Sequence, residues 1–270
     1  MPVEKVNGTP IAYEMTGEGE PLVLVHGAWV DGHTWDFVVP QLAESFSVVT
    51  YDLRGHGRSV IDPPGAGTVH DDVADLAALI ERLQIGPANV AGNSSGACIA
   101  LRLTIERPEL VRRTLAHEPP MDGLLAADPD VEAMLEEYRE SVAAVRELLE
   151  TGSHRAAAER FVDTVAVGPG TWSLLPPPVQ DTFVRHAPAF LGQLNDPDAL
   201  ELDLDALGEV STPVLLSQGD QSPPIFLPIM DQLASNAPRA ERRTLANAGH
   251  VPHMTNSDDY VAMLTGYIQA

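Results

Sequence analysis

The sequence has little positive charge, a single cysteine and no long hydrophobic run. Its 270 residues hold 16 lysines and arginines against 39 aspartates and glutamates, a formal net charge of −23. Such a surface repels nucleic acid and anionic membranes, so neither is an expected partner. Cys98 alone cannot form an internal disulfide, which suits a reducing compartment. No signal peptide or membrane span is recognisable, and we expect a cytoplasmic protein.

What the chain does have is an alternation of strand-like and helical segments. With 44% hydrophobic residues it can bury one sizeable core. The helical stripe Val73, Leu76, Ala77, Ile80 and Leu83 lies between two strand-like runs. Such alternation predicts an α/β fold with a mostly parallel sheet. The strand-like runs are 3–6, 11–15, 22–25, 47–51, 88–91, 113–116, 214–217 and 242–245, the first two joined by an Asn-Gly hairpin turn.

Residues 119–207 break this alternation. No strand-like run appears there, over a length that would normally hold two strands. A helical stripe is formed by Val131, Met134, Leu135 and Tyr138. We therefore expect helices inserted into the α/β pattern at this point.

Ser94 is the candidate nucleophile. It stands at the centre of Gly92-Asn93-Ser94-Ser95-Gly96, between a buried strand and an apolar helix. This Gly-x-Ser-x-Gly context is typical of a nucleophile elbow, a strained turn that exposes the serine hydroxyl at the end of a sheet. The two glycines must be small because the strand and helix backbones approach closely there.

Two further loops are expected at the same edge of the sheet. The turn His26-Gly27-Ala28-Trp29 follows an early strand, and its Ala28 N–H is a candidate oxyanion donor together with that of Ser95. His250 follows the last strand and is the candidate general base. The chain order is serine first and histidine last.

These motifs resemble those of α/β-hydrolase fold enzymes along essentially the whole chain. Tyr51-Asp52-Leu53-Arg54-Gly55-His56-Gly57-Arg58-Ser59 is similar to a further loop of that family. The resemblance implies an eight-stranded, mostly parallel sheet flanked by helices, with a core of residues 1–118 and 208–270. It also implies that residues 119–207 form a helical cap after the sixth strand, which shapes the substrate pocket. Candidate pocket residues are Trp29, Trp172, Phe183, His186 and Phe190, although each is equally suited to holding the cap on the core.

The acid of the triad has two candidates. Most relatives place it in a Gly-x-x-Asp segment after the strand that follows the cap, where this chain has Ser222, and Asp220 stands two residues early. Glu118 follows the strand after the elbow helix, at the same edge of the sheet. A subset that includes the zearalenone lactonases takes its acid from that position, and their motifs resemble the His117-Glu118 pair here. We favour Glu118 and keep Asp220 as the alternative.

The parts together predict a serine hydrolase of a small-molecule carboxylic ester or lactone. Other serine chemistries of the fold remain as alternatives, namely C–C bond hydrolysis, perhydrolysis and lyase activity, as does a non-catalytic binding protein. No dinucleotide or phosphate-binding motif is present, and the pair His250 and His253 lacks a third ligand for a metal. We expect no cofactor and no metal. The oligomeric state is left open, with a homodimer as one possibility.

Overall fold

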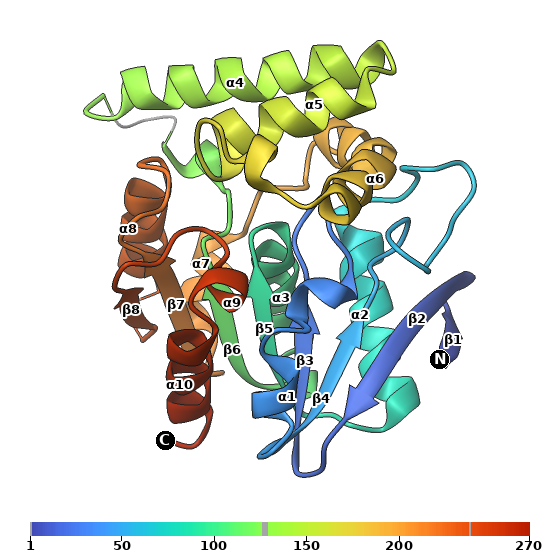
Figure 1. Ribbon diagram of the computed structural model, residues 1–270. Helices are drawn as coiled ribbons and strands as arrows, with labels where there is room; N and C mark the ends of the chain where they lie inside the picture. The colour runs from blue at the N-terminus through green and yellow to red at the C-terminus, as the bar shows by residue number, and fades with distance from the viewer. Residues whose placement is uncertain (1, 126–128, 238) are drawn as a thin grey trace.

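The chain folds around one eight-stranded sheet. The structure, a computed structural model, describes residues 2–125, 129–237 and 239–270. The strand order is β1-β2-β4-β3-β5-β6-β7-β8, antiparallel from β1 to β4 and parallel from there on (Figure 1). The predicted α/β fold with an antiparallel edge is confirmed. The strands are β1 (Val3–Val6), β2 (Thr9–Thr16), β3 (Glu20–Val25), β4 (Phe46–Tyr51), β5 (Ala88–Asn93), β6 (Val111–His117), β7 (Val214–Gly219) and β8 (Glu241–Leu245).

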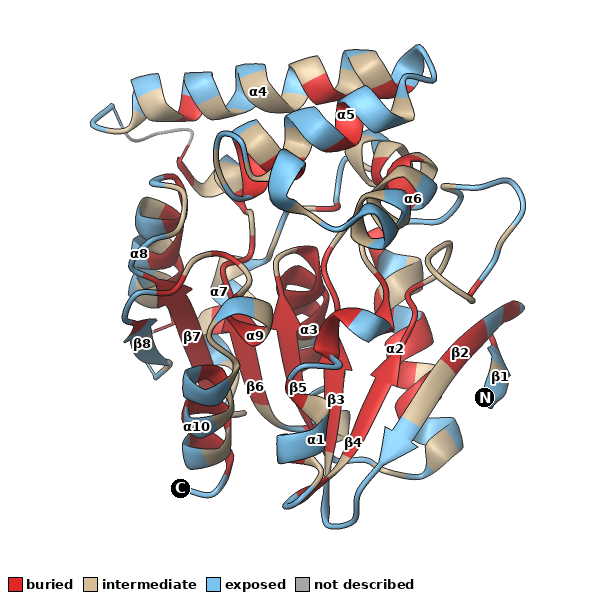
Figure 2. Cartoon of the chain, viewed as in Figure 1, coloured by how far each residue is buried: buried red, intermediate tan, exposed pale blue. Residues whose placement is uncertain are grey.

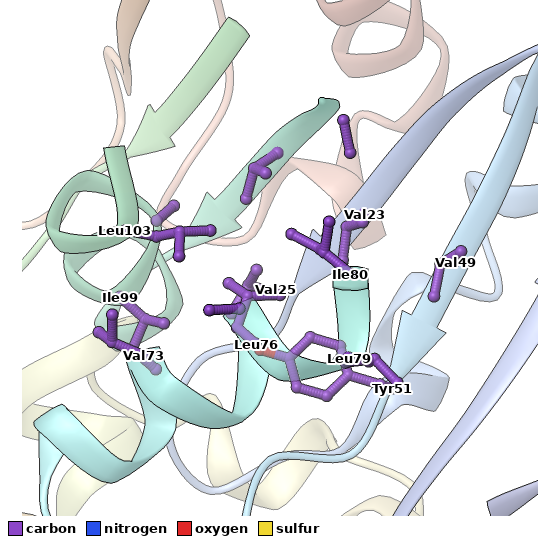
Figure 3. Close-up of a cluster of buried hydrophobic side chains, with 14 of the residues drawn as sticks. Val23, Val25, Val49, Tyr51, Val73, Leu76, Leu79, Ile80, Ile99 and Leu103 are labelled. Atoms are coloured by element: carbon purple, nitrogen blue, oxygen red, sulfur yellow. The ribbon is translucent and has the colours of Figure 1, made fainter. Parts of the chain in front are cut away.

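Helices cover both faces of the sheet, because successive strand residues point to opposite sides. Val23 and Val25 of β3 pack with α2 and α3, as Figure 3 shows, while Leu22 and Leu24 pack with α1 and α10. Both faces are therefore buried, as a parallel sheet requires. The helices around the sheet are α1 (Val39–Leu42), α2 (Val69–Leu83), α3 (Ser95–Glu106), α8 (Phe226–Asn236), α9 (Pro252–Thr255) and α10 (Ser257–Ile268).

Between β6 and β7 the described residues form helices and no strand, in agreement with the sequence pattern. Helices α4 (Glu132–Glu150), α5 (His154–Phe161) and α6 (Pro177–Asn195) lie together beyond one end of the sheet (Figure 1). We call these three helices, with the π-helical turn Val162–Ala166 that follows α5, the helical layer. The short helix α7 (Leu204–Glu209) then leads back to β7. Within the described ranges, no helix is long and apolar enough to cross a membrane.

Candidate active site

Ser94 occupies a strained turn between β5 and α3. Its backbone has φ 56° and ψ −127°, a conformation that residues other than glycine rarely adopt. The Ser94 N–H donates to the carbonyl of His117 at 2.9 Å, which anchors the turn to β6. A Cβ on Gly92 would lie 2.2 Å from the Gly96 carbonyl oxygen, and one on Gly96 would lie 2.3 Å from that of Val25. Neither position can therefore carry a side chain without moving backbone, which explains the Gly-x-Ser-x-Gly spacing.

Glu118 and His250 form a buried pair beside this turn. His250 Nδ1 lies 2.8 Å from Glu118 Oε2, and the Gly219 N–H donates to Glu118 Oε1 at 2.7 Å. The side chain of Glu118 is fully buried and that of His250 is almost so. Both carboxylate oxygens thus have a donor, one from the imidazole and one from the end of β7.

The charge on Glu118 is stabilised by these contacts. Burial alone would raise the pKa of the carboxyl, but the hydrogen bond from His250 and the nearby His117 and His250 rings lower it to about 2. An ionised Glu118 accepts a hydrogen bond from the Nδ1–H of His250, which leaves the Nε2 lone pair available to take a proton. The His250 ring is also held by Phe226, which stacks on it at 4.5 Å, and its carbonyl accepts from Asn93 Nδ2 at 2.8 Å.

Asp220, the alternative acid, does not meet the histidine. It is exposed, and its carboxylate accepts a hydrogen bond from the neighbouring Gln221 side chain at 3.2 Å. Its N–H donates to the Leu245 carbonyl at 3.1 Å, which fixes the loop with this side chain outward. The structure brings Glu118, and not Asp220, to His250.

The two candidate oxyanion donors lie next to Ser94. Ser95 is the first residue of α3, and Ala28 lies in the turn that follows β3. That turn approaches the elbow closely, since a Cβ on Gly27 would lie 3.1 Å from Ser94 Cβ. Ala28 and Ser95 line the same cavity as Ser94 and His250.

Two cavities open on either side of Ser94, between the sheet and the helical layer. Ala28, Ser94, Phe161, Ala166 and His250 line both of them. The first, here the α4-side cavity, spans about 670 Å³ with its opening to solvent included, and its wall includes Tyr138, Val142, Phe190, Leu194, Leu200 and Phe226. The second, the α9-side cavity, spans about 910 Å³ measured in the same way, and its wall includes Val30, Val162, Val167, Leu175, Phe183 and Met254.

The five aromatic and histidine candidates divide into two groups. Phe190 lines the α4-side cavity and Phe183 lines the α9-side cavity. Among the described residues lining either cavity, Trp29, Trp172 and His186 are absent. Trp29 and His186 are buried in contacts between the helical layer and loops of the core, which is the other role that the sequence left open for them, whereas Trp172 is buried against the helical layer itself.

The contacts of these three residues explain their positions. The Trp29 ring packs against Phe161 and Phe190 with centroids 5.1 and 4.9 Å apart. His186 links two loops to α6, because its Nδ1 lies 3.1 Å from the Trp29 carbonyl and its Nε2 lies 2.8 Å from the Gly57 N–H. Trp172 packs edge-on against Phe183. Each is thus committed to packing or hydrogen bonding behind the cavity walls.

Several residues of the site were not found by sequence reasoning. Phe161, Phe226 and Met254 line the cavities, and the π-helical turn Val162–Ala166 contributes to both. π-Helical turns are often found at functional sites, but no sequence signal marks this one. Met254 could have been found from the sequence. It stands four residues after the catalytic candidate His250, in the short helix α9 that begins two residues after that histidine. In the described part of the chain, no group of three or more His, Cys, Asp or Glu side chains is arranged to hold a metal ion.

Comparison with known families gives one match over most of the chain. The model of the alpha/beta hydrolase family matches residues 22–263. This range contains the elbow, both oxyanion candidates, Glu118 and His250.

Individual relatives match shorter parts of the chain or match it at low sequence identity. The chain is 35% identical over 162 residues to an uncharacterized hydrolase, YraK, of Bacillus subtilis, which covers 57% of this chain and 59% of that protein. It is 35% identical over 107 residues to the (E)-2-((N-methylformamido)methylene)succinate hydrolase of Acinetobacter baylyi, 40% of each chain. The matches thus span less than two thirds of these relatives' length. The enol-lactonase structure from Burkholderia xenovorans LB400 has a TM-score of 0.80 and 21% identity, with 100% of both chains covered, a likeness in fold alone.

Proposed function

Because the chain belongs to the alpha/beta hydrolase family, we propose that it cleaves a carboxylic ester or lactone through an acyl-enzyme on Ser94. The observation that carries this proposal is the 2.8 Å contact between His250 and the buried Glu118, beside a serine in a strained elbow. A carboxylate, an imidazole and a hydroxyl in this order are the components of a serine hydrolase. All three come from the carboxyl ends of parallel strands, so the sheet holds them in place before substrate binds.

The proposed reaction has two halves. His250 Nε2 takes the proton of the Ser94 hydroxyl as the oxygen attacks the acyl carbon, and Glu118 stabilises the imidazolium that forms. The imidazolium then gives its proton to the leaving alcohol oxygen, and the acyl group stays on Ser94. Water, deprotonated by His250 in the same way, releases the acid. In a lactone, the leaving oxygen becomes a hydroxyl on the acyl chain, so the second step releases a single hydroxy acid and His250 returns the proton to Ser94.

The negative oxygen of each tetrahedral intermediate would be bound by backbone N–H groups of Ala28 and Ser95. In other serine hydrolases, loss of one such donor costs about 2.7–4 kcal/mol of transition-state stabilisation. Here both donors are main-chain groups in turns that the close contacts around Gly27 and Gly96 fix. Among single substitutions, only proline, which lacks the N–H, would remove them.

The two cavities support a substrate with apolar groups on both sides of the reacting carbonyl. Valine, leucine, methionine and phenylalanine side chains dominate the wall of the α9-side cavity. The α4-side cavity also exposes Tyr138, Asp122 and Arg139, so its occupant would carry some polar character. One similar protein is named an enol-lactonase and another hydrolyses an N-methylformamido-substituted succinate. We extend to this chain only the class of small acyl compounds.

A fluorophosphonate probe tests the nucleophile without knowledge of the substrate. Wild-type protein should be labelled, Ser94→Ala should not, and Ser173→Ala should be labelled like wild type, because Ser173 is an exposed serine of the helical layer's connections. A screen of p-nitrophenyl esters of increasing chain length, together with lactones, then identifies the acyl class. Equal labelling of Ser94→Ala and wild type, or turnover of none of these substrates by unlabelled wild-type protein, would contradict the proposal.

A further inference from the structure

A second imidazole lies behind the catalytic pair. His117 is the last residue of β6, directly before Glu118, and its side chain is fully buried. Its Nε2 lies 3.8 Å from Glu118 Oε2, the same oxygen that contacts His250. Among the described residues, this Nε2 has no hydrogen-bond partner. A buried polar atom without a partner is costly, so its orientation toward a carboxylate calls for a physical reason.

The opposite side of the ring has a partner. His117 Nδ1 lies 2.9 Å from the Ser217 hydroxyl, on the strand residue that pairs with His117 in the sheet. Burial lowers the pKa of His117 to about 4, so near neutral pH the ring carries one proton. That proton is on Nδ1 or on Nε2.

The carboxylate decides between these two tautomers. With the proton on Nδ1, a lone pair on Nε2 would face the negative Glu118 oxygen. With the proton on Nε2, the Ser217 hydroxyl donates to Nδ1 and a positive N–H faces that oxygen. The second arrangement is attractive at every contact. The Gly249 backbone carbonyl also lies near the ring and favours an N–H there.

We propose that His117 is a positioning residue whose Nε2–H, fixed by Ser217, holds the Glu118 carboxylate in the orientation that His250 needs. This inference rests on the proposed function, because it assigns His117 a role only through Glu118 and His250. At 3.8 Å the contact is longer than a hydrogen bond, so it acts through the N–H dipole. His117 touches no substrate, since neither cavity beside Ser94 is lined by it among the residues described.

Other titratable groups surround His117. Glu118 and His250 face it from the loops after β6 and β8, and His253 of α9 and Tyr260 of α10 lie on its other side. His253 is buried, which lowers its pKa well below the usual range, so it is neutral near pH 7. His253 thus adds no positive charge near Glu118 at that pH, and the His117 N–H acts on the carboxylate as a neutral dipole.

Two substitutions of one position separate positioning from packing. In His117→Gln the amide N–H can reach the place of Nε2, whereas in His117→Asn it can replace only Nδ1 and its contact with Ser217. We expect kcat of His117→Asn to fall about tenfold with KM unchanged, because a turned Glu118 stabilises the imidazolium less, and that of His117→Gln to stay within about twofold of wild type.

NMR of the histidine rings gives an answer without a substrate. The proton on His250 Nδ1, which faces Glu118 Oε2 at 2.8 Å, should resonate upfield in His117→Asn relative to wild type and to His117→Gln, because a turned carboxylate weakens that hydrogen bond. Ser217→Ala, which frees the tautomer, should move this resonance in the same direction by a smaller amount. An unchanged resonance in folded His117→Asn, or equal resonances in the Asn and Gln variants, overturns the inference. Failure of the fluorophosphonate test on Ser94 would overturn the proposed function and leave this NMR result as it stands.

Discussion

Strand β5 and helix α4 show how differently the two halves of the site are built. All six residues of β5 are buried, whereas of the 19 residues of α4 only Leu135, Val145 and Leu149 are buried. Figure 2 shows the same contrast between the sheet and the helical layer. The chemistry of the site is therefore placed on backbone that is surrounded on all sides, and its pocket walls come partly from helices with one free face.

Because the two regions are buried to different degrees, substitutions in them should affect different properties of the enzyme. The elbow, the end of β6 and the loop after β8 are tied together by hydrogen bonds, such as Ser94 N–H to the His117 carbonyl and Asn93 Nδ2 to the His250 carbonyl. A substitution there changes the reaction itself. In the helical layer, side chains such as Phe183 and Phe190 close the cavities from one side, and their replacement alters shape more than chemistry.

The largest expected effect is on the nucleophile. Ser94→Ala should lower kcat by about 10⁶, as removal of the nucleophile does in serine proteases, with the fold retained because alanine is smaller and keeps the same backbone. Steady-state kinetics on the best ester, with circular dichroism of the same preparation, measure both. A residual rate above about a hundredth of wild type would show that the elbow does not carry the reaction.

The acid gives the next largest effect. Glu118→Gln should lower kcat by about 10³–10⁴, because the amide stabilises neither the imidazolium nor the required tautomer. Asp220→Asn should lower kcat by less than about tenfold, since that exposed carboxylate does not contact His250. The two variants differ from wild type by the same chemical change, so each serves as the control for the other. The reverse order of the two losses would place the acid on the loop after β7.

The helical layer should show smaller and selective effects. Phe183→Ala enlarges the α9-side cavity and Phe190→Ala the α4-side cavity, so each should change the kcat/KM ratio of bulky to small esters by about tenfold. Trp172→Ala is the matched control, because this buried aromatic lines neither cavity among the described residues. It should lower stability by about 3–5 kcal/mol and leave the ratio within about twofold. If Phe183→Ala and Phe190→Ala lowered kcat/KM equally for all esters, the helical layer would not control substrate shape separately from the chemistry of the sheet edge.

The smallest effect concerns pH and stability. Burial lowers the pKa of His117 to about 4 and that of His253 well below its usual range. Between about pH 6.5 and 4 the unfolded chain binds protons that the folded chain does not, so the free energy of unfolding should fall as the pH falls. Each such histidine contributes about 1.4 kcal/mol per pH unit.

A substitution of His253 tests whether the buried histidines cause this pH dependence of stability. His253→Gln keeps a side chain that can bond to the Thr34 hydroxyl, which His253 Nε2 now meets at 3.0 Å, but it cannot take up a proton. Denaturant unfolding at several pH values between 4 and 7 should give a flatter slope for this variant. An unchanged slope would mean that the pH response arises elsewhere in the chain.

The catalytic region was also the more predictable one from sequence. The strands and the elbow are marked by local patterns, namely apolar runs, the spacing of Gly92 and Gly96 around Ser94, and a histidine after the last strand. The acid was less certain, because the choice between Glu118 and Asp220 depends on how the loop after β7 turns. Backbone bonds from Asp220 to Leu245 and from Gln221 to Ala248 set that turn, and no local pattern encodes them.

The helical layer was predicted only in outline. The absence of strands indicated helices, but which aromatic side chains reach the cavities depends on how those helices pack. Trp172 and Phe183 are both large and apolar, yet one supports the wall and the other forms it. His117 carries no signal of its own in the sequence, because its contacts are with the residue next to it and with Ser217 on another strand.

The central claim is that the buried edge of the sheet carries the covalent step. Its most direct test is to mix the protein with an activated ester, to quench the reaction at early times and to locate the acyl group by peptide mass spectrometry. One acyl group is expected, on the peptide that contains Ser94, formed at least as fast as steady-state turnover. An acyl group on any other residue, formed at the turnover rate, would contradict it.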